Sequence, residues 1–307
     1  MNRNIVLALL LVPLAGAEGR FFEYKEDSLG FALDNVECKR DFTVGVMESM
    51  MEHLDGADSL SEHVATLDDD VDALAEYADE ADALGFRAYV RDSFMPHMLD
   101  AREAIRLERL EAAPVDPSVR MELGSDYNEL LEGYETCNFE SMEGFAWAKI
   151  DAYNEALEAA TDRAESLASK GISTDAIEDL IATAQDEIVD PLEREVESAE
   201  NASQVREALS KYCLFSGCPA GTNFHFGAKV AAEALGSTVD ALEEVSDDAE
   251  ADAYLAEAQG HLEDAQDVLE EIGDGVYSDG QGRTLWSAIH SAASSIKDAL
   301  YELRSAR

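Results

Sequence analysis

The chain has 307 residues, with 67 Asp and Glu against 22 Lys and Arg, so its formal net charge is −45. This charge excludes binding to nucleic acid or to anionic membranes through clustered cations, because so few cations cannot overcome the field of the chain itself. It does not indicate disorder, since 46% of the residues are hydrophobic and can bury a sizeable core.

The acidic residues are spread along the whole chain, and the longest run is Asp68-Asp69-Asp70 with its flanks. An acidic segment that serves basic proteins or multivalent cations is typically a block. In molar salt the Debye length shrinks to about 3 Å, which screens the self-repulsion of a distributed charge. We therefore expect a halophilic source; an ordinary acidic mesophilic protein is the alternative.

Residues 1–17 have the pattern of a secretory signal peptide. Arg3 precedes an apolar run from Val6 to Leu14, and Ala15-Gly16-Ala17 forms a cleavage site of small residues. The apolar run is shorter than the roughly 20 residues that a membrane span needs. We expect cleavage after Ala17 and a mature, soluble protein that is secreted or held at the cell surface, with no membrane span.

After this segment the chain is expected to be helical, because Ala, Glu, Asp and Leu dominate and alternation of β-branched residues is absent. Apolar residues from Leu60 to Ala81 recur at alternating steps of four and three, which predicts a long helix. Asp58 is the expected N-cap of this helix, and Gly85 is expected to end it. The next helix is expected to start at Pro117, since proline suits the first helical position.

Four more apolar seams follow with the same steps. They cover Ile150–Leu167, Ile177–Ile188, Leu255–Ile272 and Leu285–Ile296. The second seam begins after Ser173-Thr174, and Pro191 predicts a kink or break beyond it. Seams of this length, separated by glycine caps and turns, are typical of antiparallel bundles more than of one continuous coiled coil.

The expected fold class is all-α: antiparallel helical bundles in two or three modules of long helices, with disulfide-stapled loops. The expected modules are an N-terminal one at 18–113, a middle one at 114–212 and a C-terminal one at 213–307. A loose similarity between Asp92–Pro96 and Asp186–Pro191 suggests an internal repeat. Chance resemblance between Ala- and Glu-rich helices is the alternative explanation.

Four cysteines, Cys38, Cys137, Cys213 and Cys218, are expected to form two disulfides in a secreted chain. The short spacing favours a local bridge between Cys213 and Cys218, which leaves Cys38 to pair with Cys137. Pairing of either distant cysteine with the 213/218 loop stays open. A four-cysteine zinc site is a weaker alternative, because the sequence has no C-x-x-C pair.

Two short groups combine methionine with histidine, and thioether and imidazole are soft ligands that suit Cu(I) outside the cytoplasm. The candidate copper ligands are Met47, Met50, Met51, His53, Met95, His97 and Met98. The competing interpretation is that these methionines fill the core, as adaptable hydrophobic residues do. A di-iron site is excluded, because no histidine has a glutamate three residues before it.

The sequence contains no local catalytic motif: it lacks H-E-x-x-H, C-x-x-C-H and G-x-S-x-G. Asn201-Ala202-Ser203 is a candidate glycosylation site. We therefore expect a non-enzymatic protein with a structural or protein-interaction role at or near the cell surface. Its expected partners are other proteins, its own copies and the inorganic cations of a high-salt medium. The alternatives are an extracytoplasmic copper-binding protein and an enzyme whose site is assembled from distant residues.

Overall fold

The computed structural model describes residues 16–112, 115–214, 222–223, 226–272 and 279–305. This part of the chain is all-α, apart from a two-residue parallel pairing of β1 (Tyr212–Cys213) with β2 (Thr222–Asn223). The expected fold class of helical bundles is confirmed. None of the helices described is both long enough and apolar enough to cross a membrane.

The chain groups into two compact units, which are described separately. The N-terminal unit holds Gly19–Lys149 and Ala199–Arg206, and the C-terminal unit includes Ile150–Ser198 and Glu207–Arg307. The division falls inside the long helix α5 (Pro117–Ala168). The three modules expected from the sequence stay a prediction.

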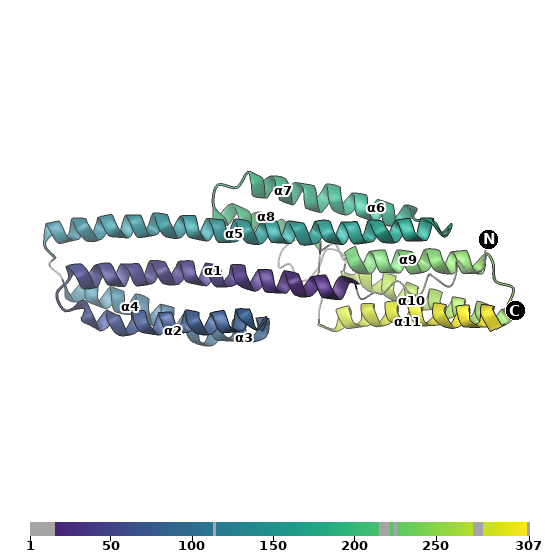
Figure 1. Cartoon of the computed structure of the whole chain (residues 1–307), viewed down its shortest axis with the longest axis horizontal. Helices are drawn as coiled ribbons and strands as arrows, with labels where there is room; N and C mark the ends of the chain where they lie inside the picture. The colour runs from purple at the N-terminus through teal and green to yellow at the C-terminus, as the bar shows by residue number, and fades with distance from the viewer. Residues whose placement is uncertain (1–15, 113–114, 215–221, 224–225, 273–278, 306–307) are drawn as a thin grey trace. The chain divides into compact units, whose positions relative to one another are not determined.

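The N-terminal unit packs shorter helices and part of α5 around one core (Figure 1). Its elements before α5 are α1 (Gly16–His53), η2 (Ala57–Ser59), α2 (Leu60–Asp79), α3 (Ala83–Tyr89), η3 (Val90–Phe94) and α4 (Met95–Glu111). Leu60, Leu67 and Leu74 from the predicted seam of α2 are fully buried in this core. The apolar spacing therefore identified the inner face of α2 correctly.

Helices α1 and α5 run antiparallel with a regular register. The disulfide Cys38–Cys137 joins their middles, which confirms the expected long-range pairing. Phe31 stands seven residues before Cys38, and its ring lies over Gly144, which stands seven residues after Cys137. On the other side of the bridge, Gly45 stands seven residues after Cys38, and it lies under the side chain of Leu130, which stands seven residues before Cys137. Each close approach thus pairs a large side chain with a glycine, so the two backbones come together without a clash.

The end of α2 differs from the expectation. The helix stops at Asp79, and Ala81 then adopts a left-handed conformation with φ of 53°. Gly85 does not end α2 but lies in α3, where its amide donates to the Asp82 side chain at 2.9 Å. A Cβ on Gly85 would lie 2.7 Å from the Tyr77 ring, so this glycine is required by close packing. Asp58 lies within η2, and Ser59 takes the N-cap position of α2.

Both proline positions that resembled each other in the sequence follow a π-helical turn. The turn η3 ends directly before Met95-Pro96, and η4 (Gln185–Val189) ends directly before Asp190-Pro191. Proline lacks an N–H and its ring collides with the carbonyl four residues earlier, and a π turn widens the helix at that point. The sequence similarity thus corresponds to one shared local structure with a steric cause.

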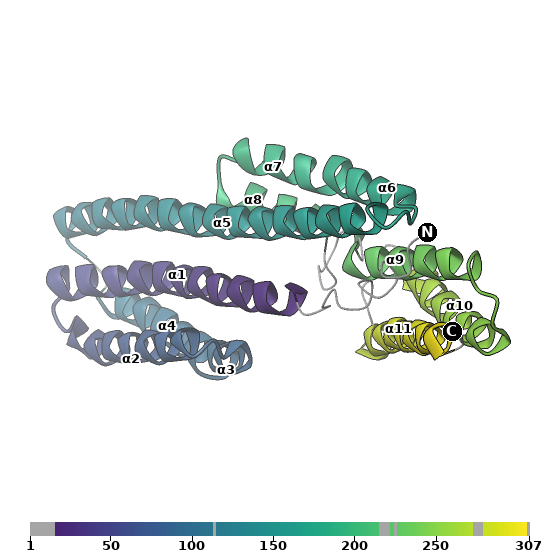
Figure 2. The same ribbon diagram turned by 45° about the vertical axis from the view of Figure 1, so that its right-hand side comes forward.

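The C-terminal unit contains α6 (Asp175–Ala184), η4, α7 (Asp190–Glu197), the end of α8 (Ala202–Lys211), α9 (Phe226–Glu243), α10 (Ala249–Ile272) and α11 (Asp279–Ser305), with the end of α5. Helices α9, α10 and α11 contact one another and lie side by side in both views (Figures 1 and 2). The predicted seams form their cores: Leu255 and Ala258 of α10 and Leu285 and Ile289 of α11 are fully buried.

Candidate functional site

The methionines of the two Met/His groups lie mostly in the core of the N-terminal unit. Met47, Met50 and Met98 are 0–2% exposed and belong to one apolar cluster, against which Met51 is partly packed. Met95 is 41% exposed. The described residues hold no group of three or more His, Cys, Asp or Glu side chains that could bind a metal. Burial in an apolar cluster gives the three methionines a packing role, and the copper site stays a prediction.

His97 contacts a buried carboxylate. Its Nδ1 lies 2.7 Å from Oδ2 of Asp70, whose other oxygen accepts a hydrogen bond from the Tyr89 hydroxyl at 3.0 Å. Asp70 is 2% exposed, whereas the His97 side chain is 42% exposed. Asp70 on the inner face of α2 therefore orients the imidazole of His97, and the two partners of this carboxylate, Tyr89 and His97, come from α3 and α4.

A carboxylate that orients an imidazole is one half of the acid–base machinery of many hydrolases. The other half is a hydroxyl or thiol within hydrogen-bond reach of the second ring nitrogen. Within the described residues, no hydroxyl or thiol is hydrogen-bonded to His97. The Asp70–His97–Tyr89 cluster thus holds a proton donor and an acceptor but no nucleophile.

His53 lies in a second polar cluster, between α1 and α5. Its Nε2 is 3.2 Å from Oδ2 of Asp126, and its Nδ1 is 3.6 Å from Glu122. The hydroxyl of Ser49 donates to the same Asp126 oxygen at 2.7 Å. These contacts hold the pKa of the Asp126 carboxyl below its usual value, first through Ser49 and then through His53. Because Ser49 donates to the carboxylate and not to the imidazole, this order of groups does not activate the serine.

An acidic groove of about 560 Å³ runs beside this cluster along α1 and α5. Its acidic lining residues are Asp41, Glu48, Glu52, Asp126 and Glu129. Phe42 and Tyr134 form an aromatic pair in the groove with ring centroids 5.3 Å apart, and the Cys38–Cys137 bridge lies at one end. Carboxylate and aromatic surfaces together suit a cationic ligand.

Lys39 of α1 takes part in a chain of hydrogen bonds that connects α1 to α5. Lys39 donates to the Asn35 amide oxygen at 2.6 Å, and Asn35 in turn donates to Asn138 of α5 at 2.7 Å. Burial lowers the pKa of Lys39, and the nearby charges of Arg206 and Arg102 lower it further. These contacts join helices and add no reacting group.

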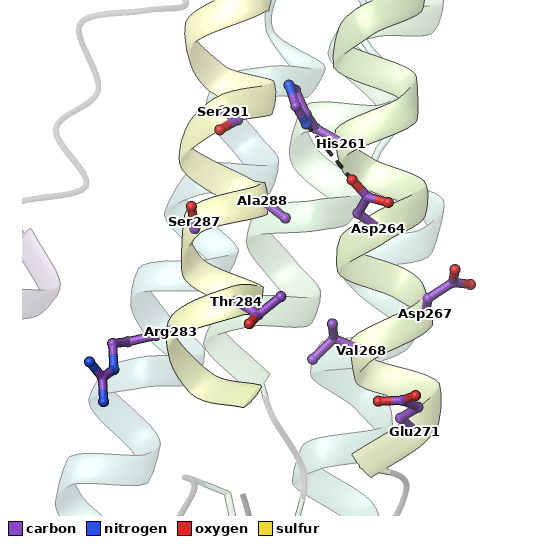
Figure 3. Close-up of a pocket in the computed structure, with 10 residues that line it drawn as sticks. All are labelled: His261, Asp264, Asp267, Val268, Glu271, Arg283, Thr284, Ser287, Ala288 and Ser291. Atoms are coloured by element: carbon purple, nitrogen blue, oxygen red, sulfur yellow. Dashed lines mark ion pairs between the residues drawn. The ribbon is translucent and has the colours of Figure 1, made fainter. Parts of the chain in front are cut away.

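A second groove, of about 700 Å³, lies between α10 and α11 (Figure 3). Helix α10 contributes His261 and three carboxylates, and α11 contributes hydroxyls from Thr284, Ser287 and Ser291. His261 lies 4.0 Å from Asp264 and 3.9 Å from Glu257, and both carboxylates are well exposed. Such solvent-exposed pairs interact weakly, so the groove offers polar contacts but no preorganised chemistry.

The remaining candidate residues have structural partners or lie outside the described residues. The Cys38–Cys137 disulfide leaves neither sulfur as a thiolate ligand, which overturns the four-cysteine zinc alternative. Cys218 lies outside the described residues, so its bridge to Cys213 stays a prediction. The exposed Asn201 caps α8, since its side-chain oxygen accepts from the amides of Ser203 and Gln204 at 3.1 Å. Its glycosylation stays a prediction.

No protein-family model, curated protein or solved structure matches this chain. Sequence reasoning missed Asp70, Tyr89, Ser49 and Asp126 as polar partners of the two histidines. In a chain with 67 acidic residues, residue type alone does not distinguish a functional carboxylate. For Asp70 the usable signal was its position, three residues after Leu67 and beside Val71 on the inner face of α2.

Proposed function

We propose that this protein is a non-enzymatic, salt-adapted helical protein that acts outside the cytoplasmic membrane through contacts with other proteins. One observation supports this role above the others: the acidic residues face the solvent. Within the described residues, Asp70 is the one buried carboxylate. A strongly charged surface of this kind keeps a protein soluble. The polar clusters and grooves described above add open surfaces for recognition without a complete catalytic set.

The signal-like segment and the disulfide support a location outside the cytoplasm, because disulfides persist in oxidising compartments. The test is expression from the native N-terminus in a host that grows in molar salt, followed by fractionation and mass spectrometry of the N-terminal peptide. We expect a protein outside the membrane that begins at Glu18. A variant with Leu10→Arg in the apolar run is the matched control and should stay inside the cell. Retention of the unaltered chain in the cytoplasm contradicts the proposed location.

The interaction role is tested by chemical crosslinking on intact cells in molar salt. We expect crosslinks from a reproducible set of exposed side chains to the same partner protein or to a second copy of this chain. A turnover assay with chromogenic esters, phosphoesters and glycosides tests the enzyme alternative. Hydrolysis that disappears in the His97→Ala variant would replace our proposal with catalysis at the Asp70–His97 pair.

The copper alternative predicts binding of Cu(I) with one-to-one stoichiometry under reducing conditions. His97→Ala and Met95→Leu change the two most exposed members of that group and leave the buried methionines in place. Stoichiometric binding that both variants weaken would establish the metal site. We expect no such binding, because the other candidate ligand on α4, Met98, is packed in the core.

A further inference from the structure

Helix α11 carries a regularly spaced stripe of basic and aromatic side chains. Arg283, His290, Lys297 and Arg304 follow one another at intervals of seven residues, and all four are exposed. Because a heptad nearly matches two helical turns, the four lie along one side of the helix. Trp286 and Tyr301 lie along the same side and are 41% and 67% exposed. We call these six residues the cationic stripe.

The cationic stripe stands out against the rest of the molecule. The chain has about three times as many acidic as basic residues, 67 against 22, yet the acidic residues of α11 between Arg283 and Arg304, Asp298 and Glu302, fall outside the stripe. Lys297 and Arg304 form no ion pair with any of the described residues. Arg283 lines the groove between α10 and α11 (Figure 3). Lys297 and Arg304, at the C-terminal end of the stripe, are therefore not paired with a carboxylate of the described residues.

Helix α10 carries a complementary face. Glu250, Glu257, Asp264 and Glu271 also follow one another at intervals of seven residues. They belong to a set of eight carboxylates on α10, all of them exposed, and the helix has no Lys or Arg. We call these four residues the acidic stripe. Both stripes span 22 residues, and the 21 steps of 1.5 Å between their ends give a length of about 32 Å.

We propose that the cationic stripe is an interface for a second copy of this chain, in which it packs against the acidic stripe of the other copy. Since both stripes have the same period and length, all four basic positions meet an acidic one whether the helices run parallel or antiparallel. A two-fold axis repeats the contact, because each copy carries both stripes. Charged pairs at heptad spacing choose helical partners in this way.

The aromatic side chains add an apolar contribution that salt does not screen. Trp286 and Tyr301 are residue types that commonly anchor protein interfaces. On α10, Ala253, Ala256 and Gly260 are exposed small residues between the charged positions, and a large ring can approach the helix closely there. The proposal deepens the interaction role above and rests on it, but the two fail separately, as the experiment below distinguishes.

The test is analytical ultracentrifugation of the full chain between about 1 µM and 0.5 mM, in 0.2 M and 2 M KCl. We expect a concentration-dependent dimer. In the Lys297→Glu/Arg304→Glu variant its dissociation constant should rise at least about tenfold in 0.2 M KCl, with a smaller rise in 2 M KCl. The matched control is Arg87→Glu/Arg120→Glu, which changes the net charge equally at exposed positions of the N-terminal unit and should leave the constant unchanged. Circular dichroism checks that both variants keep their helical content.

Charge exchange identifies the partner stripe. In the Lys297→Glu/Arg304→Glu background, Glu250→Lys/Glu257→Lys should restore dimerisation if the helices pair antiparallel, and Asp264→Lys/Glu271→Lys if they pair parallel. A monomer at all concentrations, an unchanged constant in the first variant, or no rescue by either exchange overturns the proposal. A monomer that binds an anionic polysaccharide, or another acidic protein, through Lys297 and Arg304 also overturns it but leaves the interaction role in place.

Discussion

Asp70 is the one buried carboxylate among the described residues, and its environment explains why it is tolerated. A carboxylate taken out of water loses hydration, and hydrogen bonds from neighbours have to replace it. The Tyr89 hydroxyl and the His97 imidazole both contact it. The cluster therefore links α2 to α3 and α4 at a point where the remaining contacts are apolar.

Removing this carboxylate should destabilise the N-terminal unit. In Asp70→Ala the Tyr89 hydroxyl loses its acceptor and His97 loses its partner, so the free energy of unfolding should fall by about 1–3 kcal/mol. Asp70→Asn keeps an acceptor of the same shape and should cost less. Urea denaturation in 2 M KCl measures both variants. Equal stability of Asp70→Ala and the parent would contradict a structural role for the cluster.

Lys149 predicts a dependence of stability on pH. Burial lowers the pKa of its ammonium group to about 8, from 10.5 in the unfolded chain. Between these values the unfolded chain binds more protons than the folded one, so the free energy of unfolding rises with pH. The rise from pH 8 to pH 10 should be about 2 kcal/mol.

The measurement for Lys149 is urea denaturation at pH 8, 9 and 10. The reference is Lys149→Met, which keeps an unbranched side chain, one atom shorter, and removes the titrating group. The free energy of unfolding of the parent, relative to this variant, should increase from pH 8 to pH 10. The stability gained from the neutral amine of Lys149 should be lost as the pH falls through 8. Parallel stability profiles for the two proteins would show that Lys149 titrates normally.

At the scale of elements, the pairing of α1 with α5 depends on glycines opposite large side chains. A Cβ on Gly45 would lie 2.5 Å from a Leu130 methyl carbon, and a Cβ on Gly144 would lie 2.6 Å from the Phe31 ring. The Cys38–Cys137 bridge lies midway between these two contacts. The bridge thus holds two helices whose surfaces already fit, and it closes a chain segment with a sequence separation of 99 residues.

Replacing a glycine of α1 or α5 by alanine should raise or lower the free energy of unfolding, depending on whether a side chain of the other helix faces the new Cβ. Gly144→Ala should lower the free energy of unfolding by about 1–3 kcal/mol, because the Phe31 ring has to move. Gly30→Ala, on α1 with nothing within 4 Å of the new Cβ, should raise it by up to about 1 kcal/mol through helix propensity alone. Denaturation of the two variants under the same conditions checks the contrast. Stabilisation by both would mean that α1 and α5 are not in close contact.

The sequence predicts individual helices better than their pairing. Ile150, Tyr153 and Leu157 were placed on one face by spacing, and they are 1%, 0% and 5% exposed. Spacing works here because an apolar residue shows which side of its own helix is buried. It does not show what lies opposite, so the fit of Gly45 and Gly144 and the α1–α5 register were not predictable. The end of α2 at Asp79 was missed because the apolar steps continue past it to Ala81.

In the candidate site, too, the sequence identified single residues but not the partners that contact them. The sequence selected His53 and His97 by their type, but it grouped them with neighbouring methionines. The structure places both imidazoles on carboxylates, Asp126 and Asp70, that come from other helices. Finding these partners requires tertiary contacts, and the abundance of acidic residues removes any compositional signal. The π turn before Pro96 was detectable as a sequence similarity, because its cause is local.

At the scale of the whole molecule, the charge and the core are separated. The seams of α10 and α11 bury leucine, isoleucine and alanine, while every carboxylate of α10 is exposed. Repulsion among solvent-facing carboxylates opposes the compact state and is removed by screening. The net charge therefore acts on stability through the surface and not through the packing.

This separation predicts stability that rises with salt by screening. Between 0.2 M and 3 M KCl, at a fixed protein concentration, the melting temperature should rise by about 10 °C or more. Sucrose strengthens burial without screening charge, so at equal osmotic strength it should give a smaller rise. The matched variant is Asp252→Asn/Glu263→Gln/Asp267→Asn/Glu270→Gln, which removes four exposed charges of α10 outside the acidic stripe. It should melt higher than the parent in 0.2 M KCl and equal it in 3 M KCl, as followed by circular dichroism. A parent that melts at the same temperature in both salts, or that responds equally to sucrose, would mean that the acidic surface is not a salt adaptation.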